Sequence, residues 1–487
     1  MKFRALLFLS GLLVSACGGN GAASTALAPT PTASGSAVTQ PITAFGAISA
    51  FGSVFVNGVR YDISRASLTK DGSPAIQADL AVGHMALVKG EAESTGVNGS
   101  ANSIDVEGSV VGNVASIDAP NNKLVVLGQT IIVRTGTSFS ANITGGSLTG
   151  LAVGDRVEVS GNAAANGDIN ATRIEKEAGT SFQVLGAVAA INATAHTFKI
   201  NALNVNYAGA MLDGFAAGHP ANTDVVIVRG TVFASATTTL TAARVLPSTA
   251  DPRSIAGHDT VEQEGLITRF ASAADFDVAG KKVATNASTV FRDGTSADLG
   301  MNVAVEVHGT LDATTGTLTA SVVTIEHVGV VELAAPATAV NKTAGTVTLL
   351  GVTVTLNITT RLEDKSSTHL QMFSINDLNA NDTLLVRGYE SPVGSGKVIA
   401  TRLERLPSLG TVVYVRGPFS PTIAPQFKIL GVVIDTTGAT FVTGEHGSLQ
   451  SAAFFTAAVG KIVRVRGASS GTTVTATEVA IASRDDD

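Results

Sequence analysis

MALVKG, at residues 85–90, is a short apolar run that a single glycine closes. Five later stretches repeat this pattern: RVEVSG (156–161), VVIVRG (225–230), AVEVHG (304–309), TLLVRG (383–388) and IVRVRG (462–467). Successive closing glycines are 71, 69, 79, 79 and 79 residues apart. A spacing this regular indicates one small β-module that occurs six times in tandem.

The residues around each closing glycine follow a common order. A glycine-led apolar strand comes first, as in GAISAF at Gly46, and a hairpin follows, as in SVFVNGVRYDI, where Asn57-Gly58 is typical of a type I′ turn. A polar stretch, a glycine corner, the glycine-closed strand and a last strand complete the copy. Val157 and Val159 alternate with polar residues, which gives the closed strand one apolar face. Such strands avoid exposed edges by closing into a barrel.

These patterns predict an all-β protein of six tandem barrels, each small and about five-stranded, after a signal peptide and a flexible tether. The predicted boundaries are 1–17 for the signal peptide, 18–41 for the tether, and 42–108, 109–180, 181–250, 261–327, 328–407 and 408–482 for the modules. The composition agrees, because 45% of the 487 residues are hydrophobic, none is Trp and 51 are Gly. A net charge of -7 argues against nucleic acid as a partner.

The first 17 residues carry the sharpest local signal. Lys2 and Arg4 precede an apolar stretch, Ala5–Val14, that is too short to span a bilayer as a helix. Val14-Ser15-Ala16-Cys17 then resembles the lipobox of bacterial lipoproteins, which implies cleavage before Cys17 and a lipid on its sulfur. The alternative is an ordinary signal peptide with an incidental cysteine. Cys17 is the only cysteine, so lipidation leaves no thiol for a disulfide, a metal or catalysis.

The lipobox predicts a membrane anchor of acyl chains such as palmitate, held on Cys17. The residue after it is Gly18, whereas an Asp there often marks inner-membrane retention, so we expect the outer membrane of a Gram-negative cell envelope. Residues 18–40 are rich in Gly, Ala, Ser, Thr and Pro and carry no charge. This segment is typical of a flexible tether.

The order of landmarks resembles a bacterial family known as domain of unknown function 5666. The resemblance covers roughly residues 42–482 and is carried by GDRVEVSG at Gly154–Gly161 and by Phe51–Gly90. It implies a secreted or lipid-anchored protein built of small OB-like or related barrels. No activity and no site residues come with it.

Catalytic and cofactor motifs are not apparent in the sequence. There is no H-x-H or H-E-x-x-H pair and no dinucleotide or P-loop glycine pattern. The eight histidines fall at unrelated positions of the modules. We therefore expect a protein that is not an enzyme and has neither a cofactor nor a metal site.

One position that recurs in every copy of the repeat suggests a binding surface. The residue before the closing glycine is basic or titratable in five copies: Lys89, Arg229, His308, Arg387 and Arg466. If the modules stack in register, these side chains form a ladder that faces an anionic polymer such as an acidic polysaccharide. Alternatively, an exposed strand position near an edge simply favours a long charged side chain.

The sequence thus favours a non-enzymatic, lipid-anchored envelope protein that acts as an extended scaffold, spacer or adhesion stalk. The alternative is a binding array that recognises an envelope polysaccharide or a protein partner through outward strand faces or clefts between modules.

Overall fold

A computed structural model describes residues 39–482 except 52, 94–96, 216, 249–259, 313, 327–329 and 444–446. The predicted signal peptide, the lipidation site Cys17 and nearly all of the tether lie outside these residues. Within the described part, no helix is both long and apolar enough to cross a membrane.

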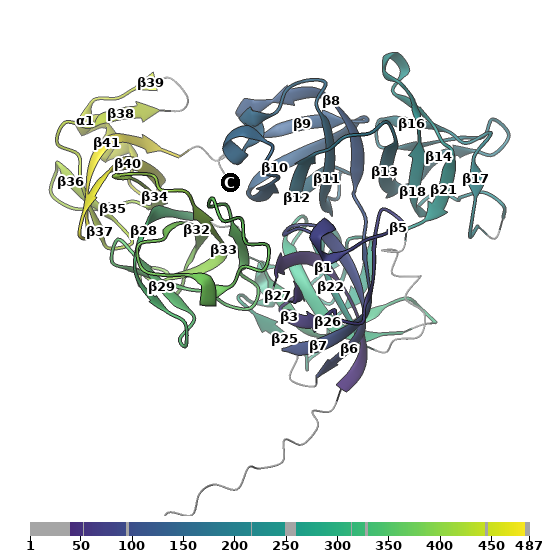
Figure 1. Ribbon diagram of the computed structural model, residues 1–487, viewed down its shortest axis with the longest axis horizontal. Coiled ribbons are helices and arrows are strands. Elements are labelled where there is room, and N and C mark those ends of the chain that lie inside the picture. The colour runs from purple at the N-terminus through teal and green to yellow at the C-terminus, as the bar shows by residue number, and fades with distance from the viewer. Residues whose placement is uncertain are drawn as a thin grey trace, which may run out of the picture. The chain divides into compact units, whose positions relative to one another are not determined.

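The predicted all-β fold class is confirmed (Figure 1). Strands dominate the described residues, and the single α-helix among them is α1 (Ser451–Ala457). Val, Ile and Thr fill these strands because their branched side chains suit a pleated, half-buried surface.

The strands of the first three predicted modules have the following bounds. They are β1 (Thr39–Ala50), β2 (Val54–Val56), β3 (Val59–Asp62), β4 (Ser67–Lys70), β5 (Ser73–Pro74), β6 (Met85–Glu93), β7 (Asn98–Val106), β8 (Val110–Asp118), β9 (Lys123–Val126), β10 (Gln129–Phe139), β11 (Arg156–Ala163), β12 (Ile169–Lys176), β13 (Phe182–Ala187), β14 (Ala189–Asn192), β15 (Thr197–Ile200), β16 (Leu203–Asn206), β17 (Met211–Leu212), β18 (Val225–Gly230), β19 (Val232–Ala234), β20 (Thr239–Thr241) and β21 (Arg244–Pro247).

The remaining strands belong to the last three predicted modules. They are β22 (Thr260–Ser272), β23 (Asp275–Val278), β24 (Lys281–Ala284), β25 (Val290–Arg292), β26 (Ala304–Leu311), β27 (Leu318–Ile325), β28 (Val331–Asn341), β29 (Thr346–Leu349), β30 (Val352–Thr355), β31 (Arg361–Asp364), β32 (Thr383–Glu390), β33 (Val398–Leu406), β34 (Val412–Pro418), β35 (Ser420–Pro421), β36 (Gln426–Ile429), β37 (Val432–Asp435), β38 (Thr440–Thr443), β39 (Gly447–Ser448), β40 (Ile462–Ser470) and β41 (Thr473–Ile481).

Five strands close into a small barrel in the first predicted module, in the order β1–β2–β3–β7–β6 and back to β1. The same ring forms from β8–β9–β10–β12–β11. It recurs as β22–β23–β24–β27–β26 and as β28–β29–β30–β33–β32. In each ring the second hairpin strand runs parallel to the last strand.

Residues 181–250 and 408–482 depart from this ring. The first segment divides between the order β13–β18–β21–β17 and a separate sheet, β14–β15–β16–β20–β19. The second follows the order β34–β40–β41–β37–β36–β35. The number of six equal barrels therefore stays a prediction.

Hydrogen-bonded strands join the predicted modules in pairs. The antiparallel pairs β8–β13 and β28–β34 join neighbours, whereas the parallel pair β1–β22 joins the first module to the fourth. One hydrophobic core runs through residues 110–245 and another through 331–479, while 42–106 and 261–325 each have a core of their own. The modules are thus not separate barrels on linkers.

Steric crowding explains why glycine occupies all six strand-closing positions. A Cβ atom at any of them would collide with a backbone carbonyl oxygen of the neighbouring strand. The carbonyls belong to Ser100, Asn170, Thr241, Thr319, Ile399 and Thr475. In five of the copies the strand pairing also shifts register at this point, as at a β-bulge. Close approach of two backbones therefore selects glycine here.

Candidate functional site

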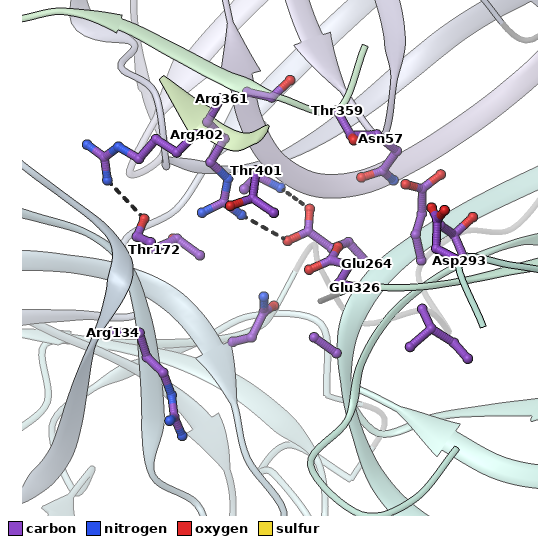
Figure 2. A pocket seen from close by; sticks show the side chains of 18 of the residues that line it. Asn57, Arg134, Thr172, Glu264, Asp293, Glu326, Thr359, Arg361, Thr401 and Arg402 are labelled. Atoms are coloured by element: carbon purple, nitrogen blue, oxygen red, sulfur yellow. Dashed lines mark hydrogen bonds and ion pairs between the residues drawn. The ribbon is translucent and has the colours of Figure 1, made fainter. Parts of the chain in front are cut away.

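A cavity of about 540 Å³ is lined by residues from the first, second, fourth and fifth predicted modules (Figure 2). This volume is typical of a small-molecule site. Strands β1, β12, β26 and β33 contribute to its walls, together with the β2–β3 turn and the segment before β31. Since these segments are far apart in the sequence, only the folded chain assembles the site.

One wall of the cavity carries carboxyl groups. The strand register places Glu264 of β22 opposite Glu306 of β26, and Glu326 follows β27. The backbone N–H of Ala47 donates to Glu264 Oε2 at 2.8 Å, and Arg361 Nη2 lies 3.5 Å from Glu264 Oε1. Glu264 and Glu326 lie beside one another in Figure 2.

Burial raises the pKa of two of these carboxyl groups, Glu306 and Glu326. It raises the pKa of Glu326 to about 8, and the charge of Glu264 adds to this, while Arg361 opposes it. Burial also raises the pKa of Glu306 well above its usual range, with further increases from Glu262, Glu326 and Glu264 against a lowering by Arg292. Burial thus disfavours the charged form of both carboxyl groups unless a positive charge lies beside them.

Two buried polar groups stand behind this acidic wall. The Tyr61 hydroxyl and Glu262 Oε2 have no hydrogen-bond partner among the described residues. Both side chains are nearly inaccessible, and burial raises the pKa of Glu262 to about 8. Burial raises the pKa of Tyr61, and the charges of Glu262 and Glu306 raise it further. An unpaired buried polar group is costly, and these two groups are buried behind the lining rather than being part of it.

Amides and hydroxyls form much of the remaining lining. Asparagines contribute from five places in the chain: Asn57, Asn162, Asn170, Asn302 and Asn357. Arg134 Nε donates to Asn170 Oδ1 at 3.1 Å on this side. Such groups both donate and accept, so they suit a ligand rich in hydroxyl or amide groups.

Arg402, which also lines the cavity, holds a buried ionic network together. It lies 2.8 Å from Glu363 and 2.8 Å from Glu404, and it donates to the carbonyl oxygen of Gly136 at 3.0 Å. Arg173 lies 3.7 Å from Glu363. The network therefore connects residues of the second and fifth predicted modules.

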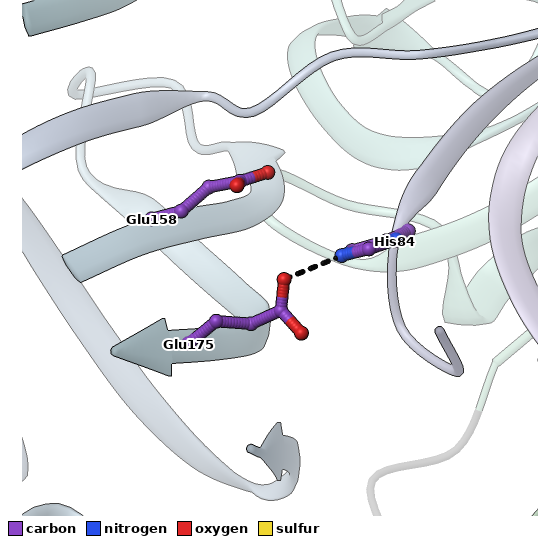
Figure 3. Close-up of side chains that lie close together, drawn as sticks. All are labelled: His84, Glu158 and Glu175. Atoms are coloured by element: carbon purple, nitrogen blue, oxygen red, sulfur yellow. Dashed lines mark hydrogen bonds and ion pairs between the residues drawn. The ribbon is translucent and has the colours of Figure 1, made fainter. Parts of the chain in front are cut away.

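A second cluster contains His84, Glu158 and Glu175, whose possible metal-ligating atoms all lie within 4.8 Å of one another (Figure 3). His84 Nε2 is 2.9 Å from Glu175 Oε2, and the backbone N–H of Ala81 donates to His84 Nδ1 at 3.0 Å. Because Nδ1 accepts, the neutral ring carries its proton on Nε2 and donates it to Glu175. In this tautomer Nε2 has no lone pair with which to bind a metal ion. A histidine that binds a metal through one ring nitrogen normally donates a hydrogen bond from the other, but here that other nitrogen, Nδ1, accepts one.

The ammonium group of Lys70 lies within this cluster, where a metal ion would otherwise sit. Its Nζ lies 3.1 Å from Glu158 and 3.2 Å from Glu175. Burial raises the pKa of Glu158 to about 8, with a further increase from Asp71 and an opposing effect of Lys70. We interpret the cluster as an ionic clamp between the first and second predicted modules, and the donor set does not fit a metal site.

A family model described as Domain of unknown function (DUF5666) matches residues 111–175, 264–324, 336–404 and 420–480. These regions make up more than half of the chain. The chain belongs to this family. The matched regions of the DUF5666 protein fall within the second, fourth, fifth and sixth predicted modules. Comparison with curated proteins finds no match.

The five residues of the predicted ladder lie on five different strands of this DUF5666 protein. Arg387 lies 2.9 Å from Glu404 and 3.2 Å from Glu332, and Arg229 Nε donates to Gln183 at 2.7 Å. His308 Nδ1 is 2.9 Å from Ser321 Oγ, Arg466 lies over the Tyr414 ring at 5.7 Å, and Lys89 is half-buried on β6. The ladder stays a prediction, although Arg229 and Arg387 already have polar partners.

Sequence reasoning missed the carboxyl groups of the cavity. Glu262 and Glu264 alternate along VEQEG at the start of a strand that otherwise reads as apolar, and this was the available signal. In the sequence, the alternation of AVEVHG assigns Glu306 to the solvent-facing side of its strand. Its burial follows from packing against residues of other modules, which no local pattern of the DUF5666 repeat encodes.

Proposed function

We propose that this protein is a non-enzymatic, lipid-anchored envelope protein that binds a polar envelope glycan in the cavity between its barrels. The observation that carries this proposal is the cavity of about 540 Å³, with its amide, hydroxyl and carboxyl lining. Sugars are recognised by such donors and acceptors in a concave site. The lipobox at Val14–Cys17 supports the anchor at the outer membrane.

The binding role is tested with the full chain in detergent and polysaccharide fractions of the cell envelope. Thr359 lies exposed at the cavity, so Thr359→Trp should obstruct the site without disturbing a core. Thr314→Trp, at an exposed position outside the lining, is the matched control. We expect the wild-type protein and the control to be retarded by one fraction in affinity electrophoresis, and Thr359→Trp to migrate freely. Equal retardation of all three would contradict binding in this cavity.

The anchor is tested by Cys17→Ser. We expect the wild-type protein to carry added acyl mass and to enter the detergent phase on phase separation. The variant should lack that mass and remain in the aqueous phase. A wild-type protein that keeps its leader and carries no acyl mass would overturn this part of the proposal.

A second candidate is the scaffold or spacer role. The hydrophobic cores that run through residues 110–245 and 331–479 support it, because they make neighbouring modules mechanically continuous. Thr359→Trp separates the two roles in cells that lack the wild-type protein. If the protein acts as a scaffold, this variant should restore its function in those cells. If the protein acts by binding a glycan in the cavity, the variant should not restore it.

A further inference from the structure

Two carboxyl groups of the acidic wall have no cation paired with them among the described residues. Of the arginines that line the cavity, Arg361 is paired with Glu264, and Arg402 is held by Glu363 and Glu404, which lie outside the lining. The third, Arg134, donates to Asn170. Glu306 and Glu326 have no ion-pair partner among the described residues. A site that leaves two adjacent carboxyl groups unpaired favours a ligand that brings its own positive charge.

The surroundings of the wall are acidic as well. Glu262 is buried outside the lining, and its charge raises the pKa of Glu306. The other charged groups near the wall are Glu264 and Arg292, beside Glu306, and Arg361, which acts on Glu326. The acidic groups outnumber these two arginines.

We propose that the ligand of this cavity carries a protonated amine, which lies between Glu306 and Glu326. The proposal rests on the proposed function and names its substrate class: an oligosaccharide with free, rather than acetylated, amino groups. The ammonium group donates to both carboxylates, while the hydroxyl groups of the sugar meet the asparagines of the other walls. Charge-assisted hydrogen bonds of this kind are about twice as strong as neutral ones.

An organic ammonium fits this wall better than a bare metal ion. Among the described residues, three possible metal ligands approach within 4.8 Å of one another only around His84. The carboxylates of the cavity form no such set of three, whereas Ca²⁺ takes six to eight oxygen ligands at about 2.3–2.6 Å.

The test uses glucosamine oligosaccharides and their N-acetylated counterparts as probes, with calorimetry on the full chain in detergent. Glu306→Gln and Glu326→Gln keep the side-chain shape and remove the charge. Glu91→Gln, at an exposed position on β6 outside the lining, is the matched control. We expect the glucosamine probe to bind the wild-type protein and the control, and either cavity variant to bind it roughly 10-fold to 100-fold more weakly.

The remaining outcomes separate this inference from the proposed function. If both probes bind equally and the cavity variants bind like the wild-type protein, the ammonium proposal is wrong and glycan binding stands. If neither probe binds but an envelope polysaccharide does so in a Thr359-dependent manner, the ammonium proposal alone fails. If neither the probes nor any polysaccharide bind, both proposals fail. Binding of Ca²⁺ that Glu306→Gln abolishes, without binding of the amine, would assign a metal site instead.

Discussion

Each strand-closing glycine lies where two backbones approach too closely for a side chain. At Gly388, a Cβ atom would collide with the carbonyl oxygen of Ile399 on the neighbouring strand. Backbone cannot move aside as the end of a flexible side chain can, so even a methyl group strains the strand pair. This explains why the repeat keeps glycine here while the surrounding residues vary.

Gly388→Ala should therefore lower the free energy of unfolding by roughly 1–3 kcal/mol, because the methyl group forces β32 and β33 apart. Gly209→Ala is the matched control, since a Cβ atom there meets nothing within 4 Å and the backbone is not left-handed. The free energy of unfolding of that variant should lie within about 0.5 kcal/mol of the wild-type value. Urea unfolding followed by circular dichroism measures both. Equal midpoints for the two variants would refute the steric explanation.

The half-buried carboxyl of Glu326 makes stability depend on pH. Its pKa rises from the usual 4.5 to about 8 on folding. The stabilising contribution is therefore complete below pH 4.5 and is lost as the pH rises through 8, because the unfolded chain releases this proton first. Glu326→Gln should remove this loss, so its melting temperature should exceed that of the wild-type protein more at pH 8 than at pH 5. If the difference in melting temperature between the variant and the wild-type protein stays the same from pH 5 to pH 8, the pKa of Glu326 is not raised on folding.

At the scale of elements, buried charges connect strands of different barrels. Arg402 of β33 is 2% exposed and contacts Glu363 of β31, Glu404 of its own strand and the backbone of β10. A buried ion pair contributes little compared with an apolar substitute, yet removing one partner leaves an uncompensated charge. The network thus acts mainly to fix how these strands meet.

Arg402→Met should destabilise the protein by about 3–5 kcal/mol, since Glu363 and Glu404 lose a buried cation. Arg60→Met, at an exposed arginine of β3, should change stability by less than about 1 kcal/mol. Adding Glu404→Gln to Arg402→Met should recover part of the loss. Denaturant titration of the three variants checks this order. A double variant that is no more stable than Arg402→Met would exclude the charge as the cause.

At the scale of the whole molecule, pairs of predicted modules share their interior. Strand β28 pairs with β32 of its own barrel and with β34 of the next, and all three contribute to one hydrophobic core. Neither barrel can open at this seam without exposing apolar residues of the other. Local opening should therefore involve both.

Hydrogen exchange of the full chain tests this shared opening. The amides of Leu333 on β28 and Val415 on β34 should exchange with the same opening free energy, because their strands are paired at these residues. The exposed strand β14 should exchange faster. Strongly different protection of Leu333 and Val415 would show that the two modules open independently.

The sequence predicts the local parts of this architecture better than their assembly. The hairpin at Asn57-Gly58 and the glycine-closed strands lie where their patterns place them, because turn chemistry and close backbone approach are local. The β1–β22 pair is not predictable in this way, since an alternating strand such as Ile42–Phe45 accepts any compatible edge. A cleft between modules was among the expected binding sites, but its lining was not predictable, because separate modules supply Glu306, Asn170 and Arg402.

The parallel pair of β1 and β22 has a consequence for how the protein is made. About two hundred residues separate Ile42 from its partner Thr260, so a chain emerging from its amino end presents β1 long before β22 exists. Until then, that edge of the first barrel offers unpaired N–H and C=O groups to any passing strand. During that interval β1 is open to pairing with the wrong strand, which later pairing with β22 prevents.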